Sequence, residues 1–461
     1  MEKLTLAEVV KAVQGRLVRG NADAEITGVS TDTRTLAPGD VFFALVGENA
    51  DGHLYVSRAL EAGAGALVVS DESAIPADVR APVILVEDPL WALGDLAAFY
   101  RSRFDVRVVG VTGSVGKTTT KEMLGAILQR KWSVLKNEMN FNNEIGVPQT
   151  LFQLDRGHEV VVLEMAMRGI GEIRRLAQIA RPEVGLITNV GLSHIERLGS
   201  QGAIADAKAE LLQELPPDGL AVLNAEDGYF NLMTERFGGR VLSFGSCDDA
   251  DVCASRILQA SDGRCECVIR AEAGEIGVSL PVVGYYNVYN AIAAAAVAVG
   301  MGVELETIKD GLESYTQPSM RMELTRSRRG FTVLNDSYNA SPSSMIAALK
   351  TLQALVGYKR TIAVLGDMLE LGDYAPKAHW DVGAAAVRSG VVSLVAVGPL
   401  AAEIAAGAKD AGLPDAEAAW YPDSSAAASQ IGSLVRKGDA VLVKGSRAMK
   451  MEQIVRALLD E

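Results

Sequence analysis

A glycine-rich turn between two regular segments constrains this 461-residue chain more than any other feature of its sequence. The stretch VVGVTGSVGKTTTKEML, residues 108–124, joins an apolar run to an amphipathic run that opens with Lys117 and Thr118. Tight turns before a helix direct several backbone N–H groups at one point, where the helix dipole also favours an anion. The stretch therefore predicts a strand, a phosphate-holding loop and a helix within an α/β fold.

The loop is a variant of the common phosphate-binding pattern. G-x-x-x-x-G-K-[ST] requires glycine at position 111, where this chain has Val111. We expect Lys117 to reach the terminal phosphates and the Thr118 hydroxyl to be a magnesium ligand. A glycine-rich turn that binds nothing is the alternative. The residues expected to contact the nucleotide here are Thr112, Gly113, Ser114, Gly116, Lys117, Thr118 and Thr119.

Length and composition restrict the class of protein. Domains commonly hold about 100 to 200 residues, so a chain of this length predicts three of them. The formal charge of −14 argues against a nucleic-acid partner, because a polyanion is bound by clustered Lys and Arg. We find no run of about eighteen apolar residues and no cleavable leader, so we expect no membrane partner and a cytoplasmic location. We also expect a monomer.

The pattern of apolar runs predicts an α/β protein of three domains. Residues 1–103 form a small α/β unit, residues 104–318 a central phosphate-loop domain with a parallel sheet, and residues 319–461 a doubly wound, Rossmann-like domain. A stretch that resembles a series of hairpins runs from about Gly239 to Val283. The boundary near Pro318 follows from a break in the pattern at SYTQPSMRME.

Two polar residues follow apolar strands of the central domain. Glu164 ends VVVLEM and His194 lies shortly after VGLITNV, so both belong to the sheet edge where open α/β sheets present their ligands. A lone buried carboxylate is costly, which favours a metal-binding role for Glu164 over a structural one. Histidine is an uncommon magnesium ligand, so the residues alone leave His194 equally explained as a surface side chain.

A series of motifs in fixed order gives the chain a family resemblance. NEMNFNNEIGVPQTL, VLEMAMRGIGEI, TNVGLSHIERLGS, AIADAKAELL, GYYNVYNAIAAAA, PSMRMEL, NDSYNASPSSMIAAL, LGDMLELG and VKGSRAMKMEQ follow the loop or accompany it. Together they resemble the Mur ligases of peptidoglycan synthesis. The resemblance covers nearly the whole chain, including STDTRTLAPGDVFFALVGENADGH near its start. The motifs from residue 336 onward are similar to those of the member that adds D-alanyl-D-alanine to a UDP-MurNAc-tripeptide.

The resemblance implies an ATP-dependent amide ligase whose partners are UDP-MurNAc-tripeptide and D-alanyl-D-alanine. The tripeptide carboxylate would be phosphorylated, and the dipeptide amine would displace the phosphate. Lys117 would stabilise the transferring phosphate. The implied cofactors are ATP and two Mg²⁺ ions, with Thr118 and Glu164 at the first metal and His194 at the second. Lys208 resembles the family lysine that reacts with carbon dioxide to become a carbamate, although alone it would be a solvated helix lysine.

The resemblance also assigns the remaining nucleotide contacts. Asn287 and Asn290 look like the family's adenine-side asparagines, and Tyr286 stands where the family usually has histidine. Arg321 and Asp336 look like the residues that the third domain contributes to phosphate and to ribose hydroxyls. Surface salt bridges are the alternative for these last two.

Substrate contacts are implied in three places. Asn142 and Asn143 resemble a loop along the muramoyl substrate. The segment Ser30, Asp32 and Arg34 resembles the uridine-diphosphate end, with a plain polar turn as the alternative. The dipeptide end is assigned to Tyr338, Asn339 and Ser341, and Ser341 replaces the second asparagine of the family's usual Asn-Ala-Asn-Pro.

Other functions stay open at this point. A sibling ligase that adds a diamino acid or glutamate, or a folylpolyglutamate synthetase, would share the loop and the carbamate lysine. A phosphate-loop kinase or switch protein would need neither the first unit nor NDSYNASP, and a non-catalytic nucleotide scaffold would need no metal ligands. The sequence does not distinguish meso-diaminopimelate from lysine as the third residue of the tripeptide.

Overall fold

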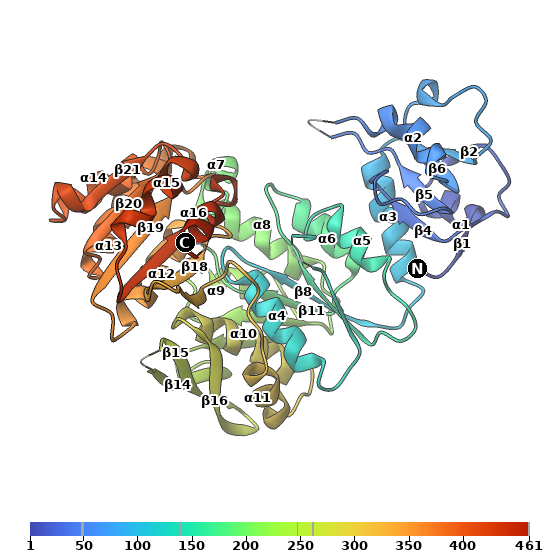
Figure 1. The fold of residues 1–461 in the computed structure, drawn as a ribbon. Helices are drawn as coiled ribbons and strands as arrows, with labels where there is room; N and C mark the ends of the chain where they lie inside the picture. The colour runs from blue at the N-terminus through green and yellow to red at the C-terminus, as the bar shows by residue number, and fades with distance from the viewer. Residues whose placement is uncertain (48–49, 139, 247, 261, 460–461) are drawn as a thin grey trace.

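Three α/β parts follow one another along the chain (Figure 1). The computed structural model describes residues 1–47, 50–138, 140–246, 248–260 and 262–459. The first part and the last part, blue and orange to red in Figure 1, lie on either side of the central part. The predicted α/β class and the order of three such parts are confirmed, while the limits at residues 103 and 318 stay predictions.

The first part is built on a five-stranded sheet. Strand β2 is antiparallel to β7, and the other neighbours are parallel. The sheet has the order β2 (Arg16–Arg19), β7 (Val83–Leu85), β6 (Ala66–Val69), β5 (Asp40–Phe43) and β4 (Gly28–Ser30). A separate pair of strands joins β1 (Leu4–Thr5) to β3 (Glu25–Ile26), and the helices are α1 (Leu6–Ala12), α2 (Val56–Glu61) and α3 (Pro89–Arg101).

Helix α3 leads out of this unit and fastens it to the central part. It begins at Pro89 because the Asp88 carboxylate accepts the backbone N–H of Leu90 at 2.7 Å, which is an ordinary N-cap. At the other end of the helix, the buried Tyr100 hydroxyl donates to the carbonyl of Leu154 at 2.7 Å. The two parts therefore share a packed boundary.

The central part carries a nine-stranded sheet. Its order is β16 (Gly274–Val283), β15 (Arg264–Ala271), β14 (Val252–Gln259), β13 (Arg240–Gly245), β12 (Leu220–Asn224), β11 (Val184–Ile187), β8 (Arg107–Thr112), β10 (Val160–Glu164) and β9 (Val134–Lys136). Pairing is parallel from β9 to β14 and antiparallel from β14 to β16. The expected hairpins are found only from β14 on. The expectation from Gly239 was wrong for β13, which pairs in parallel on both sides.

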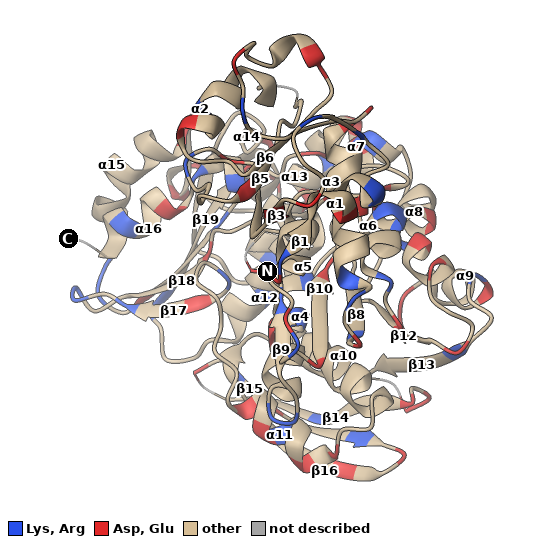
Figure 2. Ribbon diagram, turned by 90° about the vertical axis from the view of Figure 1, so that its right-hand side faces the viewer, with Lys and Arg blue, Asp and Glu red and all other residues tan. Residues whose placement is uncertain are grey.

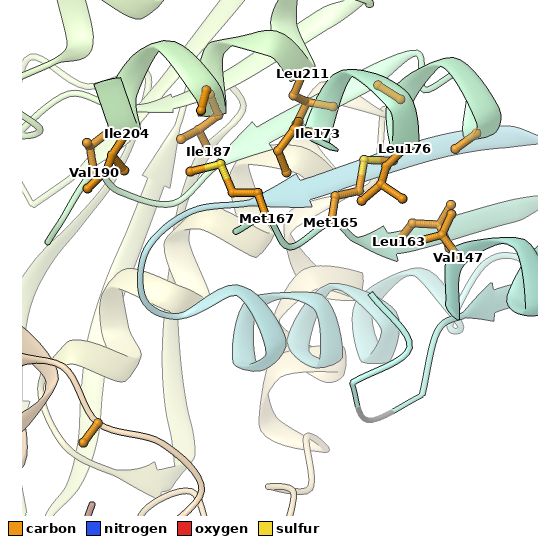
Figure 3. Packing of buried hydrophobic residues seen from close by; sticks show 14 of the residues in the cluster. Val147, Leu163, Met165, Met167, Ile173, Leu176, Ile187, Val190, Ile204 and Leu211 are labelled. Atoms are coloured by element: carbon orange, nitrogen blue, oxygen red, sulfur yellow. The ribbon is translucent and has the colours of Figure 1, made fainter. Parts of the chain in front are cut away.

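Helices cover both faces of this sheet, as its continuous apolar strands predict. Along β10, Val160 and Val162 face one core, whereas Val161 and Leu163 face the other. Figure 3 shows Leu163, Met165, Ile173 and Leu211 between the sheet and the helices of one face. The helices are α4 (Lys117–Leu128), α5 (Gly146–Leu151), α6 (Glu172–Ala180), α7 (Ile195–Leu198), α8 (Gln201–Gln213), α9 (Phe230–Glu235), α10 (Tyr286–Gly300) and α11 (Leu305–Glu313).

The last part is the doubly wound sheet that was expected. Its order is β17 (Glu323–Arg326), β18 (Thr332–Asp336), β22 (Asp439–Lys444), β19 (Arg360–Gly366), β20 (Ser393–Val397) and β21 (Ala418–Tyr421), with only β17 antiparallel to its neighbour. Side chains of α12 (Pro342–Ala354), α13 (Ala375–Arg388) and α14 (Ala402–Asp410) share one core, and those of α15 (Ser424–Leu434) and α16 (Glu452–Leu459) share the other.

Charged residues are spread over all three parts in Figure 2, where segments with Lys and Arg and segments with Asp and Glu are intermixed. None of the helices in the described part of the chain is long and apolar enough to cross a membrane.

Candidate active site

The phosphate loop lies between β8 and α4 at the carboxyl edge of the central sheet. Strand β8 continues through Val111, which is fully buried and pairs with Glu164 on one side and Leu186 on the other. Because Val111 belongs to the strand and not to the turn, position 111 does not require glycine. This explains why the loop departs from the common pattern there. The turn comes later, at Gly113 with φ 148° and Gly116 with φ 89°, in backbone conformations that favour glycine.

Each of these glycines also faces a side chain that leaves no room for a Cβ atom. A Cβ on Gly113 would lie 1.9 Å from Thr188 Oγ1, and one on Gly116 would lie 2.3 Å from Asn290 Oδ1. Thr188 follows β11, and Asn290 lies on α10. The loop is therefore shaped by segments distant in sequence as well as by its own glycines.

The end of β11 braces the middle of the loop. The Thr188 hydroxyl and the Asn189 side-chain amide both donate to the carbonyl of Val115, at 2.7 and 2.8 Å, and the Val115 N–H donates to Asn189 Oδ1 at 2.9 Å. The Ser114 hydroxyl accepts the N–H of Gly191 at 2.8 Å. These bonds hold the loop open as a rigid cradle, which is what binding a phosphate at a helix N-terminus requires.

Lys117 and Thr118 open α4 beneath the loop. The Lys117 ammonium donates to the carbonyl of Gly113 at 2.8 Å, and burial lowers the pKa of this lysine. The Thr118 hydroxyl donates to Glu164 Oε2 at 2.7 Å. Thr112 and Thr119, also expected at the nucleotide, are buried beside them. The residues expected around the phosphates are thus together.

Glu164 and Thr118 are the centre of a small polar cluster. Asn142 Nδ2 donates to Glu164 Oε1 at 2.8 Å, and Arg321 Nη2 donates to the Thr118 hydroxyl at 3.0 Å. The Arg321 guanidinium also lies 4.0 Å from the centre of the Tyr338 ring, where a cation is attracted by the ring face. Arg321 comes from the last part of the chain, so the cluster is assembled from two parts.

The donor atoms of this cluster suit magnesium. Glu164 and Thr118 supply a carboxylate and a hydroxyl, and Mg²⁺ prefers oxygen ligands and usually takes few of them from the protein. Within the part of the chain that the structure describes, no three His, Cys, Asp or Glu side chains form a metal cluster. A magnesium ion here would depend on ligands from a nucleotide and from water.

Two further residues that the sequence did not single out support Glu164. Asn137 Nδ2 donates to the Glu164 carbonyl at 2.9 Å, and the Glu164 N–H donates to Asn137 Oδ1 at 2.9 Å. The ammonium of Lys121, fully buried on α4, donates to the Asn137 carbonyl. Asn137 begins the motif NEMNFNN, which also contains Asn142 and Asn143. Its place in that motif was the signal from which a role at the site could have been inferred.

His194 is held by a residue of the last part. It caps the short helix α7 with φ 66°, and its Nδ1 lies 2.5 Å from Glu370 Oε2. The Glu196 N–H also donates to the Glu370 carbonyl, at 3.3 Å. The hydrogen bond and ion pair with His194 lower the pKa of Glu370. Glu370 lies in LGDMLELG, a motif noted from the sequence but given no role there.

Lys208 is buried on α8 instead of being solvated. The alternative of a solvated helix lysine is wrong, because only 1% of this residue is exposed. Burial lowers the pKa of Lys208 well below its usual value, with a further contribution from the charge of Lys117. Among the described residues its amine has no hydrogen-bond or ion-pair partner.

Asn287 and Asn290 lie in the first turns of α10, against the loop. Asn287 Nδ2 donates to the Val283 carbonyl at 2.8 Å, and Asn290 Nδ2 donates to Asn287 Oδ1 at 3.0 Å. Burial and the Asp336 carboxylate hold the pKa of the neighbouring Tyr286 well above its usual value.

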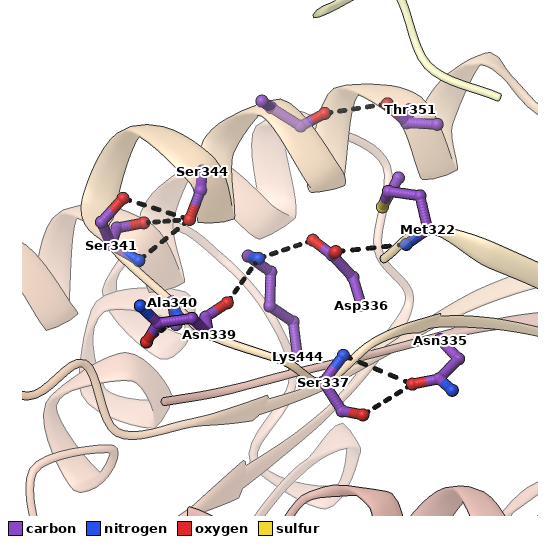
Figure 4. Close-up of polar contacts among 11 residues, drawn as sticks. Met322, Asn335, Asp336, Ser337, Asn339, Ala340, Ser341, Ser344, Thr351 and Lys444 are labelled. Carbon is purple, nitrogen blue, oxygen red and sulfur yellow. Dashed lines mark hydrogen bonds and ion pairs between the residues drawn. The ribbon is translucent and has the colours of Figure 1, made fainter. Parts of the chain in front are cut away.

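Asp336 belongs to a polar group in the last part (Figure 4). Its Oδ2 lies 2.5 Å from Lys444 Nζ, and the same ammonium donates to the Asn339 carbonyl at 2.8 Å. The Ser341 N–H donates to Ser344 Oγ at 2.9 Å in the first turn of α12. Lys444 was not among the expected residues, although it lies in the noted motif VKGSRAMKMEQ.

The remaining expected residues make local turns. The Asp32 carboxylate accepts from the Arg34 guanidinium at 2.5 Å, which lowers the pKa of Asp32 to about 2. The Ser30 hydroxyl donates to the Asp32 carbonyl at 3.0 Å. Asn143 Oδ1 accepts the Gly146 N–H at 2.9 Å at the start of α5. Ser30, Asp32 and Arg34 lie on the first part of the chain, in and just after β4, where the Thr31 hydroxyl between them accepts from the Gln149 side chain of α5 at 2.9 Å.

Three family descriptions match consecutive stretches of the chain. They are "Mur ligase family, catalytic domain" over residues 25–101, "Mur ligase middle domain" over 111–298 and "Mur ligase, glutamate ligase domain" over 320–447.

Relatives and solved structures agree with these matches. The UDP-N-acetylmuramoyl-tripeptide–D-alanyl-D-alanine ligase of Bacillus subtilis is 36% identical over 461 residues, covering 100% of this chain and 99% of that protein. A crystal structure of MurF from Acinetobacter baumannii superposes with a TM-score of 0.92 at 31% identity and full coverage of both chains. MurF from Thermotoga maritima, in complex with ADP, has a TM-score of 0.84 at 28% identity, covering 94% of this chain and 97% of that one.

Proposed function

The chain belongs to the Mur ligase family, and we propose that it joins D-alanyl-D-alanine to a UDP-N-acetylmuramoyl-tripeptide in an ATP-dependent reaction. The products are the UDP-MurNAc-pentapeptide, ADP and phosphate. This reaction supplies a peptidoglycan precursor, and we place it in the cytoplasm.

One observation carries the proposal. The Thr118 hydroxyl of the phosphate cradle contacts both Glu164 of the central part and Arg321 of the last part. A nucleotide phosphate on the cradle would therefore lie between the central part and the last part. A second substrate carried by the last part could reach it there. A kinase or switch protein would need neither the first part of the chain nor the segment NDSYNASP.

The first step activates the tripeptide carboxylate. Its oxygen attacks the γ-phosphorus of ATP, the bond to the β–γ bridging oxygen breaks, and ADP leaves. Such a transfer depends on charge neutralisation and alignment more than on covalent help from the protein. Lys117 and Arg321 supply fixed positive charge at the cradle, and the rigid backbone of the loop supplies the alignment.

The second step forms the amide. The dipeptide amine attacks the acyl carbon, the bond from that carbon to the phosphate oxygen breaks, and the amine loses a proton. Phosphate is a good leaving group, whereas oxide from a free carboxylate is not. The dipeptide is brought by the last part, for which we propose the segment with Tyr338, Asn339 and Ser341.

Magnesium fits the cradle. Thr118 and Glu164 would hold one ion and His194 would help to hold a second. When bound, these ions neutralise charge on the phosphate oxygens. The Asn142 side chain and the Thr118 hydroxyl already orient the Glu164 carboxylate, and the paired bonds with Asn137 hold the backbone of Glu164.

A carbamate on Lys208 also fits. Carbon dioxide reacts with a neutral amine, and burial favours the neutral form of this lysine. A buried amine that has no partner among the described residues is costly as a structural feature. Carbamylation would convert this buried amine into an oxygen ligand beside the metals.

The other contacts are proposals of the same kind. Arg321 would contact phosphate and Asp336 the ribose hydroxyls. Asn287 and Asn290 would lie on the adenine side, and Asn142 and Asn143 along the muramoyl substrate. Ser30, Asp32 and Arg34 would hold the uridine diphosphate.

A coupled assay tests the reaction. Phosphate release should require both the UDP-MurNAc-tripeptide and D-alanyl-D-alanine, and mass spectrometry should identify the pentapeptide. Release that is independent of the dipeptide would contradict the proposal, and so would a product carrying a diamino acid or glutamate instead. Running tripeptides that end in meso-diaminopimelate and in lysine side by side would decide which of the two is preferred.

A further inference from the structure

Lys444 ends the central strand of the last sheet, directly beside Asp336. Strands β22 and β18 are parallel, and Lys444 and Asp336 are partners in their register. Alternate residues of a strand face opposite sides, so Lys444 shares a face with Leu442, and Asp336 shares a face with Leu334. Both leucines belong to the core that α12 covers. The sheet itself therefore places ammonium and carboxylate on the same side of one edge.

The Lys444 ammonium is fully committed to two partners. It lies 2.5 Å from Asp336 Oδ2 and 2.8 Å from the Asn339 carbonyl, and its side chain is only 3% exposed. The other oxygen of Asp336 accepts the N–H of Met322 at 3.2 Å, directly after Arg321. A buried ammonium needs such partners, because leaving it unpaired is costly.

These two partners, Asp336 and Asn339, belong to the proposed binding sites of two different substrates. Asp336 is the proposed contact for the ribose of ATP. Asn339 lies in the segment before α12 that we propose for the dipeptide (Figure 4). We infer that Lys444 is a positioning residue that fixes these two sites relative to each other, so that the nucleotide and the dipeptide are held in register by one cation. This inference rests on the proposed function.

Lys444→Met tests the inference, because methionine keeps the length of the side chain and removes its charge. It should leave Asp336 without its cation and free the 337–341 segment, so KM should rise at least tenfold for ATP and for D-alanyl-D-alanine together. Lys377→Met is the matched control, since Lys377 makes an exposed pair with Asp381 on α13 in the same part of the chain. KM values for the control should not change.

A rise in only one KM, or in neither, would overturn the inference. Thermal unfolding and far-ultraviolet circular dichroism show whether Lys444→Met is folded. If it is not, Asp336→Asn replaces it: a rise in the dipeptide KM along with that for ATP supports the coupling, and a rise for ATP alone refutes it. Failure of the proposed function is recognised separately, because the unaltered protein would then release no phosphate in response to the dipeptide.

Discussion

The two halves of the proposed active site are built in opposite ways. The central half is a loop of consecutive residues, Gly113 to Thr118, whose backbone is braced by the end of β11. The half from the last part consists of single side chains that reach across, Arg321 to Thr118 and Glu370 to His194. The first half is preorganised within the central part of the chain, by its own glycines and by the end of β11. The second exists only while the two parts of the chain are engaged, as in ligases that close domains around their substrates.

The largest expected effect lies in the central half, at Lys208. Lys208→Ala should lower kcat by about 10³-fold or more, because it removes the proposed carbamate and its ligand oxygens. A small added carboxylate should restore part of the activity. Steady-state assays with and without formate or acetate check both points.

Lys350→Ala, an exposed lysine on α12, is the control and should be fully active. A fully active Lys208→Ala would contradict the carbamate. In that case the central half of the site would depend on the phosphate loop and not on Lys208.

The next largest effect is expected at Arg321, which crosses from the last part to the Thr118 hydroxyl. Arg321→Ala should lower kcat by about 10²-fold, in the range seen when one charged donor to a transition state is removed. Arg321→Lys should recover little, because a lysine cannot keep both the bond to Thr118 and the contact with the Tyr338 ring. Single-turnover measurement of ADP formation checks the first step directly.

Arg388→Ala, on the exposed end of α13, serves as the control. If Arg321→Ala were to change only the KM for ATP, the crossing contact would serve binding and not the phosphoryl transfer.

A smaller effect is expected at Glu370. Glu370→Gln should lower kcat by about tenfold, as residues that orient a metal ligand do. Hydrogen exchange of residues 191–199 should also become faster, because the Glu370 contact holds that segment. Glu403→Gln on α14 should change neither quantity. Unchanged exchange with lowered kcat would mean that Glu370 acts on the chemistry without fixing the two parts together.

The smallest effect is expected far from both halves, at Arg34. Arg34→Ala should raise the KM for the UDP substrate by about threefold, since an exposed pair contributes little. The pKa of Asp32 is lowered to about 2, so the pair is complete above the usual carboxyl range near pH 4 and is lost as the pH falls through 2. The KM of the unaltered protein should therefore be independent of this pair between pH 5 and 9. A KM that changes within that range would assign the UDP end to other residues.

The sequence predicted what depends on short-range pattern. Neighbouring residues were enough to predict the strand, glycine turn and helix around Lys117. They were also enough to place Glu164 at the carboxyl edge of the sheet. Glu370, Lys444 and Asn137 were missed because their roles depend on partners 176, 108 and 27 residues away, and no local pattern specifies such pairs. The burial of Lys208 was likewise missed, although the residues three and four positions away from it on either side along α8 are all apolar.

The loop glycines have a consequence for how this protein can evolve. Gly113 and Gly116 each lie against a side chain from another segment, Thr188 and Asn290, in a backbone conformation that resists a Cβ atom. A substitution at either glycine meets two barriers at once: the clash of its Cβ atom with the facing side chain, and the positive φ. Shortening the facing side chain removes the clash but leaves the unfavourable φ. Neutral drift should therefore be almost absent at these two positions, while Val115 between them, which bonds to Thr188 and Asn189 through its backbone, is free to vary.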